Sequence, residues 1–373
     1  MIARHLPPVD HARTFARKVL VSALGTLSSP HHPDRYLELV DPLLATSVTR
    51  ARITHVDRNA SGSVTFTVSP ARPVRFEPGS HVPLSITVDG VRHTRTYSPA
   101  YAPGAVRDGS GPIVFTVGLH PDGIVSRHLY EHAQPGLVVE LGEPAGDFVL
   151  PTPRSERLIL IGGGSGITPV LSMLEGLAAE GHTGAVTFLY YARTPAHVPR
   201  REALDALAAL PNVEVVLVYT RSGDGALQGR FDAAHLQAVA PWFADTPVYV
   251  CGPAGLVSRV RDVYARDGAE NLVHVEEFTP PTYTVDPDDA TGTVSFASSG
   301  VVADNTGVTV LEHAENAGLT PEHGCRMGIC HSCTAVRLSG CTRDVRTGEL
   351  DSEPGTRIQI CINAPVGDVA VDL

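Results

Sequence analysis

The amino-acid sequence predicts a multidomain protein of mixed α+β and α/β class, with an antiparallel β-barrel, a parallel α/β domain and a small C-terminal domain in that order. The chain has 373 residues, more than one hydrophobic core usually holds. Short alternating apolar runs give way, after Pro153, to apolar strands that alternate with helical patterns. Near the C-terminus, four cysteines fall within residues 325–341.

The barrel domain is expected over residues 46–152, because its short apolar runs are separated by Gly and Pro turns. The expected strands are residues 64–68, 82–88 and 113–117. The α/β domain is expected over residues 153–278, because strands that alternate with helices predict a parallel sheet. Its expected strands are residues 158–161, 186–191 and 213–219, and its first helix is residues 169–180.

A linker is expected over residues 279–292, which begin Thr-Pro-Pro-Thr-Tyr and continue with an acidic stretch. The C-terminal domain follows over residues 293–373. Its expected helix is residues 309–317, and its expected short strands are residues 334–338 and 358–360.

Residues 1–45 fit none of these domains and form an N-terminal extension. Between residues 12 and 27 the apolar residues recur at helical spacing, with basic residues elsewhere, which predicts an amphipathic helix. Two interpretations stay open: the helix packs on the barrel, or it docks on a membrane surface or a partner helix.

Charge and hydropathy exclude several classes of function. The formal charge of -11 argues against nonspecific nucleic-acid binding, which needs Lys and Arg to neutralise phosphates. No apolar run approaches the roughly 20 residues that span a bilayer. The N-terminus lacks the pattern of a secretory signal, so we expect a cytoplasmic protein, with peripheral contact at the inner face of the cell membrane through residues 12–27 as a further interpretation.

The most specific motif is a cysteine loop. Four residues separate Cys325 from Cys330, and two separate Cys330 from Cys333. Cys361 follows after 27 more. This is the plant-type spacing for a 2Fe-2S cluster, in which a tight loop brings three thiolates together and a distant strand delivers the fourth. Structural zinc is the alternative, although zinc modules usually pair two short Cys-x-x-Cys knuckles. The expected metal ligands are Cys325, Cys330, Cys333 and Cys361, whereas Cys341 and Cys251 lie outside the pattern.

Two ordered motifs in the barrel domain suit a flavin nucleotide. An Arg-Thr-Tyr-Ser motif at residues 95–98 closes a strand, and alternation places Arg95 and Tyr97 on one side. A guanidinium there can hold phosphate while the aromatic ring lies along the flavin or ribose. Downstream, a Gly-Ile-Val-Ser motif at residues 123–126 opens a short helical pattern, where backbone N–H groups and a hydroxyl can hold a pyrophosphate.

The α/β domain carries a glycine-rich turn at residues 162–166, directly after an apolar strand. It differs from the Gly-x-Gly-x-x-Gly fingerprint, but its glycines also permit close approach of a phosphate to a helix N-terminus. A plain strand-to-helix turn is the alternative. Cys251 ends a later strand at the ligand-binding edge, where its thiol can lie beside a nicotinamide. Glu276 and Phe278 close the domain, and they either approach the flavin or serve packing.

These motifs resemble the ferredoxin-NADP reductase superfamily, in the branch with a C-terminal ferredoxin domain, over about residues 46–373. Similar chains include reductases of multicomponent oxygenases and of phenylacetyl-CoA epoxidation. The resemblance implies a flavin-binding barrel, an NAD(P)-binding domain and a β-grasp 2Fe-2S ferredoxin domain, with FAD as the flavin. It also implies that Ser98 lies near the reactive ring nitrogen and that Glu276 and Phe278 flank the flavin, as in flavohaem reductases.

The expected catalytic residues are Ser98, Cys251, Glu276 and Phe278. The expected cofactor-binding residues are Arg95, Thr96, Tyr97, Ser98, Thr116, Val117, His120, Gly123, Val125, Ser126, Gly163, Gly164, Thr168, Pro169, Arg193, Arg201, Cys251, Gly252 and Pro253. NADPH is favoured over NADH, because no acidic residue follows the strand at residues 186–191 to hold ribose hydroxyls. Candidates for a phosphate pocket are Arg193, Arg200, Arg201 and Arg221.

A narrower resemblance concerns the electron acceptor. Residues 34–43 resemble the N-terminal segment of bacterial reductases that supply electrons to membrane acyl desaturases. The expected function is electron transfer from NADPH through FAD and the cluster to a separate di-iron fatty acyl desaturase or hydroxylase, membrane-bound. From Asp286 to Leu373 there are thirteen acidic residues against five arginines, which favours a basic acceptor. The alternatives are a reductase for a soluble aromatic-ring or haem oxygenase, and a redox-sensing adaptor without sustained turnover.

Overall fold

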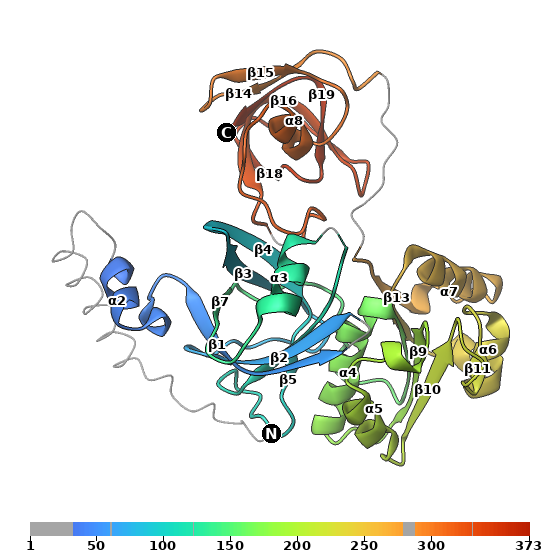
Figure 1. Ribbon diagram of the computed structural model, residues 1–373. Helices are drawn as coiled ribbons and strands as arrows, with labels where there is room; N and C mark the ends of the chain where they lie inside the picture. The colour runs from blue at the N-terminus through green and yellow to red at the C-terminus, as the bar shows by residue number, and fades with distance from the viewer. Residues whose placement is uncertain (1–32, 60–61, 122, 279–287, 330) are drawn as a thin grey trace, which may run out of the picture.

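The computed structural model describes residues 33–59, 62–121, 123–278, 288–329 and 331–373. The helix expected over residues 12–27 and the expected ligand Cys330 lie outside the described residues. Three sheets organise the described chain, and Figure 1 shows the third domain seated on the first near β3 and β4, with the second domain alongside the first. The predicted fold class is confirmed.

The first domain is an antiparallel half-barrel whose strands alternate buried and exposed side chains. Val64, Phe66 and Val68, for example, point into the core and are fully buried. Helix α3 (Ile124–His132) packs against β3 and β6. The strands are β1 (Thr49–Asn59), β2 (Ser63–Pro70), β3 (Val82–Val88), β4 (Val91–Tyr97), β5 (Ala100–Tyr101), β6 (Ile113–Gly118) and β7 (Val138–Leu141), in the order β4-β3-β7-β1-β2-β6-β5.

The second domain is a parallel sheet with helices on both faces, so its strands are nearly continuous apolar runs. The strands are β8 (Arg157–Gly163), β9 (Ala185–Ala192), β10 (Val213–Tyr219), β11 (Leu227–Gln228), β12 (Val248–Cys251) and β13 (Val273–Glu276), in the order β11-β10-β9-β8-β12-β13. The helices are α4 (Ile167–Ala179), α5 (Arg201–Ala208), α6 (Ala233–Val239) and α7 (Ala254–Arg266).

The third domain is a mixed sheet that packs on helix α8 (Val310–Asn316). A capping box starts this helix: Thr309 and Glu312 exchange side-chain and backbone hydrogen bonds. Asp289, within the expected linker, already belongs to this domain, because its carboxylate accepts a hydrogen bond from Arg343 at 2.8 Å. The strands are β14 (Thr293–Phe296), β15 (Val301–Asp304), β16 (Thr334–Asp344), β17 (Leu350–Asp351), β18 (Thr356–Gln359) and β19 (Asn363–Asp372).

The end of the N-terminal extension forms helix α2 (Asp34–Val40) and a 3₁₀ turn at Pro42–Leu44. The Asp34 carboxylate holds this segment on the barrel, because it accepts hydrogen bonds from the backbone and hydroxyl of both Thr46 and Ser47, at 2.5–2.8 Å. Among the described residues, no helix is long and apolar enough to cross a membrane.

Replacement of Asp34 by Asn tests this attachment. Burial alone raises the pKa of Asp34, but the hydrogen bonds from Ser47 and Thr46 outweigh it and hold the pKa well below its usual range. The stabilisation is therefore present above a pH of about 4 and is lost as the pH falls below it. We expect Asp34→Asn to weaken the attachment of α2 by about 2 kcal/mol at neutral pH. Hydrogen–deuterium exchange of residues 34–47 at several pH values measures this, and identical exchange in both proteins would contradict it.

Candidate functional site

The site is built on the carboxyl ends of three parallel strands. The register of β8, β12 and β13 places Gly162, Cys251 and Glu276 side by side at one edge of the sheet. This is the switch point of the sheet, where successive connections leave in opposite directions and ligands bind. Gly166 permits the close fit of the glycine-rich turn, because a Cβ there would lie 2.2 Å from the Cys251 carbonyl oxygen.

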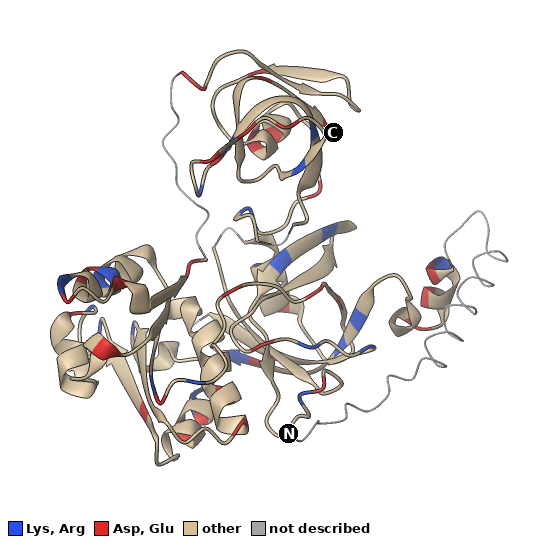
Figure 2. Ribbon diagram, turned by 180° about the vertical axis from the view of Figure 1, so that it is seen from behind, with Lys and Arg blue, Asp and Glu red and all other residues tan. Residues whose placement is uncertain are grey.

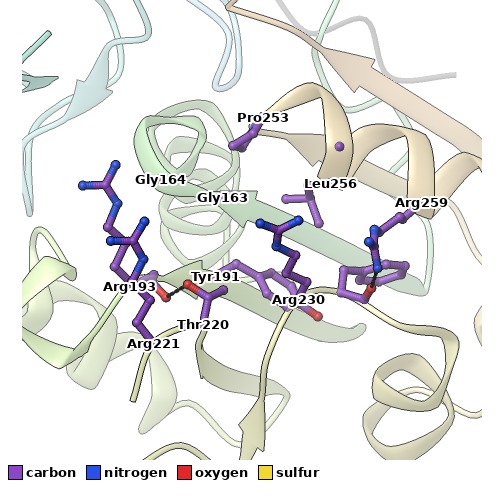
Figure 3. Close-up of a pocket in the computed structure, with 13 residues that line it drawn as sticks. Gly163, Gly164, Tyr191, Arg193, Thr220, Arg221, Arg230, Pro253, Leu256 and Arg259 are labelled. Carbon is purple, nitrogen blue, oxygen red and sulfur yellow. Dashed lines mark hydrogen bonds between the residues drawn. The ribbon is translucent and has the colours of Figure 1, made fainter. Parts of the chain in front are cut away.

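A cavity of about 520 Å³ opens over this edge, between the glycine-rich turn, the ends of β9 and β10, and the start of α7. Of the predicted residues it contains Gly163, Gly164, Arg193 and Pro253. Four arginines line it: Arg193, Arg221, Arg230 and Arg259. In Figure 3, the side chains of Arg193 and Arg221 lie beside one another, and those of Arg230 and Arg259 come from the opposite side.

These four arginines differ from their neighbours in having no carboxylate partner within the described residues. Arg200 instead pairs with Glu175 at 2.5 Å, and Arg201 pairs with Asp205 at 2.8 Å. Neither lines this cavity, so the predicted cofactor contact of Arg201 finds no support in this geometry. A cavity with four uncompensated guanidinium groups fits a ligand that carries several phosphates.

Three other predicted nucleotide contacts lie beneath the cavity surface. Pro169 is buried in the first turn of α4. Gly252 packs against Gly163, and a Cβ on Gly252 would lie 3.1 Å from the Gly163 backbone. Cys251 is fully buried in the core, and burial, reinforced by Glu276 and Glu277, raises the pKa of its thiol well above the usual value. Its thiol is therefore a neutral group at physiological pH.

A second cavity, of about 340 Å³, lies where all three domains meet. It brings together residues that are far apart in the sequence, from the barrel, from the edge of the parallel sheet and from the cysteine loop. The predicted residues that line it are Arg95, Thr96, Tyr97, Ser98, Thr116, Val117, His120, Gly123, Val125, Ser126, Thr168, Glu276 and Phe278. The expected cluster ligand Cys325 also lines it, together with residues that were not among the expected site residues: His81, Gly118, Ser165, Met327 and Ile329.

The N-terminus of α3 forms one wall of this second cavity. Ser126 folds back on the turn before the helix, because its hydroxyl accepts a hydrogen bond from the His120 N–H at 3.2 Å. Gly123 has no room for a side chain, since a Cβ would lie 2.3 Å from the Ser126 hydroxyl oxygen. The free N–H groups of the first helical turn thus remain available to an anionic group.

Two buried polar atoms in the wall indicate what the second cavity holds. Within the described residues, the Ser98 hydroxyl oxygen and Glu276 Oε2 are buried without a hydrogen-bond partner. A buried polar group usually has a partner, so both atoms fit a ligand with hydrogen-bonding ring atoms, such as a flavin. Burial raises the pKa of Glu276, and the neighbouring His81 partly offsets the rise. Phe278 is partly exposed at the mouth of the cavity.

A groove of about 310 Å³ connects the two cavities. Thr116, His120 and Thr168 belong both to the groove and to the second cavity, whereas Gly164 and Arg193 belong both to the groove and to the arginine-lined cavity. The walls are therefore continuous from one cavity to the other. A dinucleotide can lie along this path with its phosphates at the arginines and its nicotinamide at the flavin.

The cysteine loop is shaped to hold a cluster. The backbone N–H groups of Met327 and Ile329 point at the Cys325 sulfur, at 3.3 and 3.4 Å. Cys333 and Cys361 are buried, and the hydrogen bond that the Cys361 thiol shares with Cys333, together with burial, raises the pKa of Cys361. The described cysteines alone do not form a three-ligand metal site. Converging N–H donors and closely packed sulfurs are nevertheless what an iron-sulfur cluster requires.

Serine variants test the cysteine assignment, with Cys341 as the matched control because it belongs to the same domain but lies outside the motif. Cys361→Ser should lower the iron and acid-labile sulfide per chain by more than about tenfold, whereas Cys341→Ser should retain both. Chemical iron and sulfide assays of the purified proteins, with their visible absorption, measure the difference. Equal cluster content in the two variants would show that Cys361 is not a ligand.

Comparison with known proteins agrees with this geometry. Three family models match the chain: an oxidoreductase FAD-binding domain over residues 52–150, an oxidoreductase NAD-binding domain over residues 160–262, and a 2Fe-2S iron-sulfur cluster binding domain over residues 297–362. An NADPH oxidoreductase of Mycobacterium tuberculosis is 36% identical over 93% of this chain and 90% of its own. The glycine betaine monooxygenase reductase subunit of Pseudomonas aeruginosa is 26% identical over 83% of this chain and 90% of its own.

The solved structures agree as well. The structure of phthalate dioxygenase reductase matches 87% of this chain and 97% of its own, with 25% identity and a TM-score of 0.58. The predictions of an FAD-binding barrel, a nicotinamide-nucleotide domain and a 2Fe-2S domain are confirmed. The chain belongs to the NAD(P)H oxidoreductases of the ferredoxin-reductase type, with a C-terminal 2Fe-2S domain in the phthalate dioxygenase reductase arrangement.

Proposed function

We propose that this oxidoreductase uses NADPH and delivers electrons, through FAD and the 2Fe-2S cluster, to a separate di-iron fatty acyl desaturase or hydroxylase in a membrane. The observation that carries the electron path is the composition of the second cavity. Cys325, Met327 and Ile329 of the cysteine loop line the same cavity as Ser98 and Glu276. The cluster and the flavin are therefore neighbours in the proposed path.

FAD held in this cavity would supply the conversion of a two-electron hydride donor into single-electron outputs, which suits a one-electron cluster. The residues of the chain supply the positioning. Thr116 and Thr168 border both the groove and the flavin cavity, so they support the nicotinamide against the flavin. Arg95 borders the flavin cavity and is assigned to a flavin phosphate.

One proton must leave in each cycle, because a hydride brings one proton with two electrons and only the electrons pass to the cluster. We assign its removal to Glu276. Its Oε2 atom is buried in the cavity wall without a partner in the described chain, and its pKa is raised. A raised pKa makes this carboxyl group a better proton acceptor than an ordinary glutamate side chain. Ser98, whose hydroxyl faces the same cavity, is assigned to the ring nitrogen that receives the hydride.

The preference for NADPH is supported by the four arginines without carboxylate partners in the described chain. An adenosine 2′-phosphate adds two negative charges that NADH lacks, and guanidinium groups bind phosphate in a bidentate manner. Arg193 and Arg221 lie together at the ends of β9 and β10. The relative from Mycobacterium tuberculosis is named for NADPH, which favours the same choice.

Arg221→Ala tests this preference. The loss of a charged hydrogen bond to the phosphate should raise the KM for NADPH about ten- to hundredfold, with less than about a threefold change for NADH. Arg266→Ala, at the exposed end of α7, is the control and should change neither value. Steady-state reduction of ferricyanide with each nucleotide gives the KM values of the wild-type protein and of both variants. A similar rise in the KM for both nucleotides would mean that Arg221 does not bind the 2′-phosphate.

Two features support a basic partner at a membrane. Figure 2 shows Asp and Glu distributed over the third domain, in agreement with its excess of acidic residues. Beside the cysteine loop, a groove of about 920 Å³ contains His331, Asp344 and Glu349 and shares no lining residue with the flavin cavity. On α2 and the turn after it, the apolar side chains of Leu39 and Leu44 are exposed. Acidic docking residues beside the cluster suit electron delivery to a basic surface.

Reconstitution distinguishes the candidate acceptors. With NADPH, this protein should support acyl desaturation by membranes that contain a di-iron desaturase, and added salt should slow the reaction because the encounter is electrostatic. Glu349→Lys should slow desaturation by about threefold or more at low salt and leave ferricyanide reduction unchanged. Glu270→Lys, on the second domain, is the matched control.

Two outcomes would favour other functions. Turnover with a soluble ring-hydroxylating or haem oxygenase, and none with the membranes, would favour a reductase for a soluble oxygenase. The name of one relative, the glycine betaine monooxygenase reductase subunit, points to the same kind of acceptor. Lack of steady-state cytochrome c reduction by the fully loaded protein would favour a redox-sensing adaptor.

A further inference from the structure

His81 is a residue of the first domain whose single ring touches the other two domains. Its Nε2 atom lies 3.2 Å from the carbonyl oxygen of Ile329 in the cysteine loop. Its Nδ1 atom lies 3.8 Å from Oε1 of Glu276, at the end of β13. The ring lines the flavin cavity, and the residue is only 5% exposed. No sequence motif indicated this position, and the proposed electron path does not yet use it.

The ring of His81 is fixed from its own domain. The backbone of His81 exchanges two hydrogen bonds with Ala145, both 2.9 Å long, in an isolated antiparallel bridge. Gly146 follows with a φ of +107°, and a Cβ on it would lie 2.7 Å from His81 Nδ1. The glycine therefore leaves the space that the imidazole fills, and the closely packed neighbours allow the ring little freedom.

The direction of the hydrogen bond follows from its acceptor. A carbonyl oxygen can only accept, so Nε2 carries the hydrogen that is donated to Ile329. Ile329 in turn donates its N–H to the Cys325 sulfur at 3.4 Å. His81 is thus connected to a cluster ligand through one residue of the loop, and its other nitrogen faces the carboxylate assigned to the proton step.

Two other contacts join the barrel to the third domain near this loop. Arg92 pairs with Glu322 at 3.0 Å, but both side chains are largely exposed, and such ion pairs contribute little. Arg95 donates to the Gly324 carbonyl at a longer 3.3 Å. The His81 residue is only 5% exposed, and a hydrogen bond from a buried donor is better sheltered from water than an exposed ion pair.

We propose that His81 is a positioning residue that fixes the cysteine loop against the flavin cavity through the Ile329 carbonyl, and so sets the rate of electron transfer from flavin to cluster. The proposal rests on the electron path described above. It assigns no chemistry to the ring: the residue holds the loop in place and takes no part in hydride transfer. Of the two contacts of the ring, the hydrogen bond from Nε2 to the Ile329 carbonyl is the one that holds the loop.

The choice of variants separates the two ring nitrogens. Glutamine can place its amide N–H near the position of His Nε2, whereas the shorter asparagine reaches only the position of Nδ1. Phenylalanine keeps the approximate shape and removes both nitrogens. His81→Gln should therefore retain most of the function, and His81→Asn and His81→Phe should lose it. His55→Phe, on the exposed surface of β1 in the same domain, is the matched control.

Rapid mixing of the holoprotein with NADPH resolves the two steps. Bleaching of the flavin reports hydride transfer and should be unchanged in the control His55→Phe, and the ratio of the cluster-reduction rate to the bleaching rate in each His81 variant isolates the second step. Cluster reduction, followed by freeze-quench electron paramagnetic resonance, should slow roughly two- to tenfold in His81→Asn and His81→Phe, as expected for the loss of one docking hydrogen bond. The resonance spectrum of the reduced cluster should keep its wild-type shape, because all cluster ligands remain.

A second readout needs no turnover. In the oxidised holoprotein, hydrogen–deuterium exchange of residues 325–329 should be faster in His81→Asn and His81→Phe and near wild type in His81→Gln. If His81→Phe does not fold, the comparison of His81→Gln with His81→Asn still tests the proposal. Wild-type cluster reduction and exchange in His81→Asn would overturn the proposal, and so would rescue by Asn but not by Gln. Failure of NADPH to bleach the wild-type flavin would instead contradict the proposed function.

Discussion

The parallel register of β8, β12 and β13 is the constraint on which the whole site depends. It places the glycine-rich turn, the end of β12 and Glu276 at one edge of the sheet. Helix α4, which leaves that edge, then attaches the barrel. The Ser172 hydroxyl donates a buried hydrogen bond of 2.7 Å to the Pro99 carbonyl, and Gly176 leaves room for Pro78. Because Pro99 follows Ser98 in the chain, this contact brings the flavin motif over the ligand-binding edge.

Features that are local in the sequence could be predicted from it. The cysteine loop, the Arg-Thr-Tyr-Ser motif and the glycine-rich turn each combine residue type and spacing within a few positions. Their meeting in one cavity follows from the family arrangement. His81, Arg230 and Arg259 could not be predicted, because each reaches its site through a long-range contact that leaves no spacing signal. For Arg201 the partner is local: Asp205, one helical turn away, pairs with it, and Arg201 does not line the arginine-lined cavity.

Strand and helix boundaries show the same limit. Strand β16 extends to Asp344, whereas the sequence predicted an end at residue 338. Its pairing with β19 shifts register twice between Arg337 and Cys341, and such bulges break the alternation on which a sequence prediction relies. Helix α2 was missed because it is short and is held by the hydrogen bonds of Asp34 rather than by an apolar stripe.

The cysteine loop contains two residues with strained backbone conformations. Arg326 and His331 both adopt positive φ angles, of 57° and 55°, which cost a residue with a side chain roughly 1–2 kcal/mol. The surroundings compensate: Glu315 pairs with Arg326, and Gln359 contacts His331 at 3.1 Å. A glycine could adopt this backbone at position 331 without that cost, and here the contact with Gln359 accompanies the strained conformation of His331.

Arg95 has a consequence for assembly of the holoprotein. Its guanidinium lines the flavin cavity and also donates to the Gly324 carbonyl, one residue before a cluster ligand. Any flavin phosphate that orients this guanidinium also orients the donor for the third domain. By thermodynamic reciprocity, whatever factor flavin adds to the docking of the third domain, docking must add to the retention of flavin. Any such coupling between flavin loading and docking of the third domain would act through this one guanidinium.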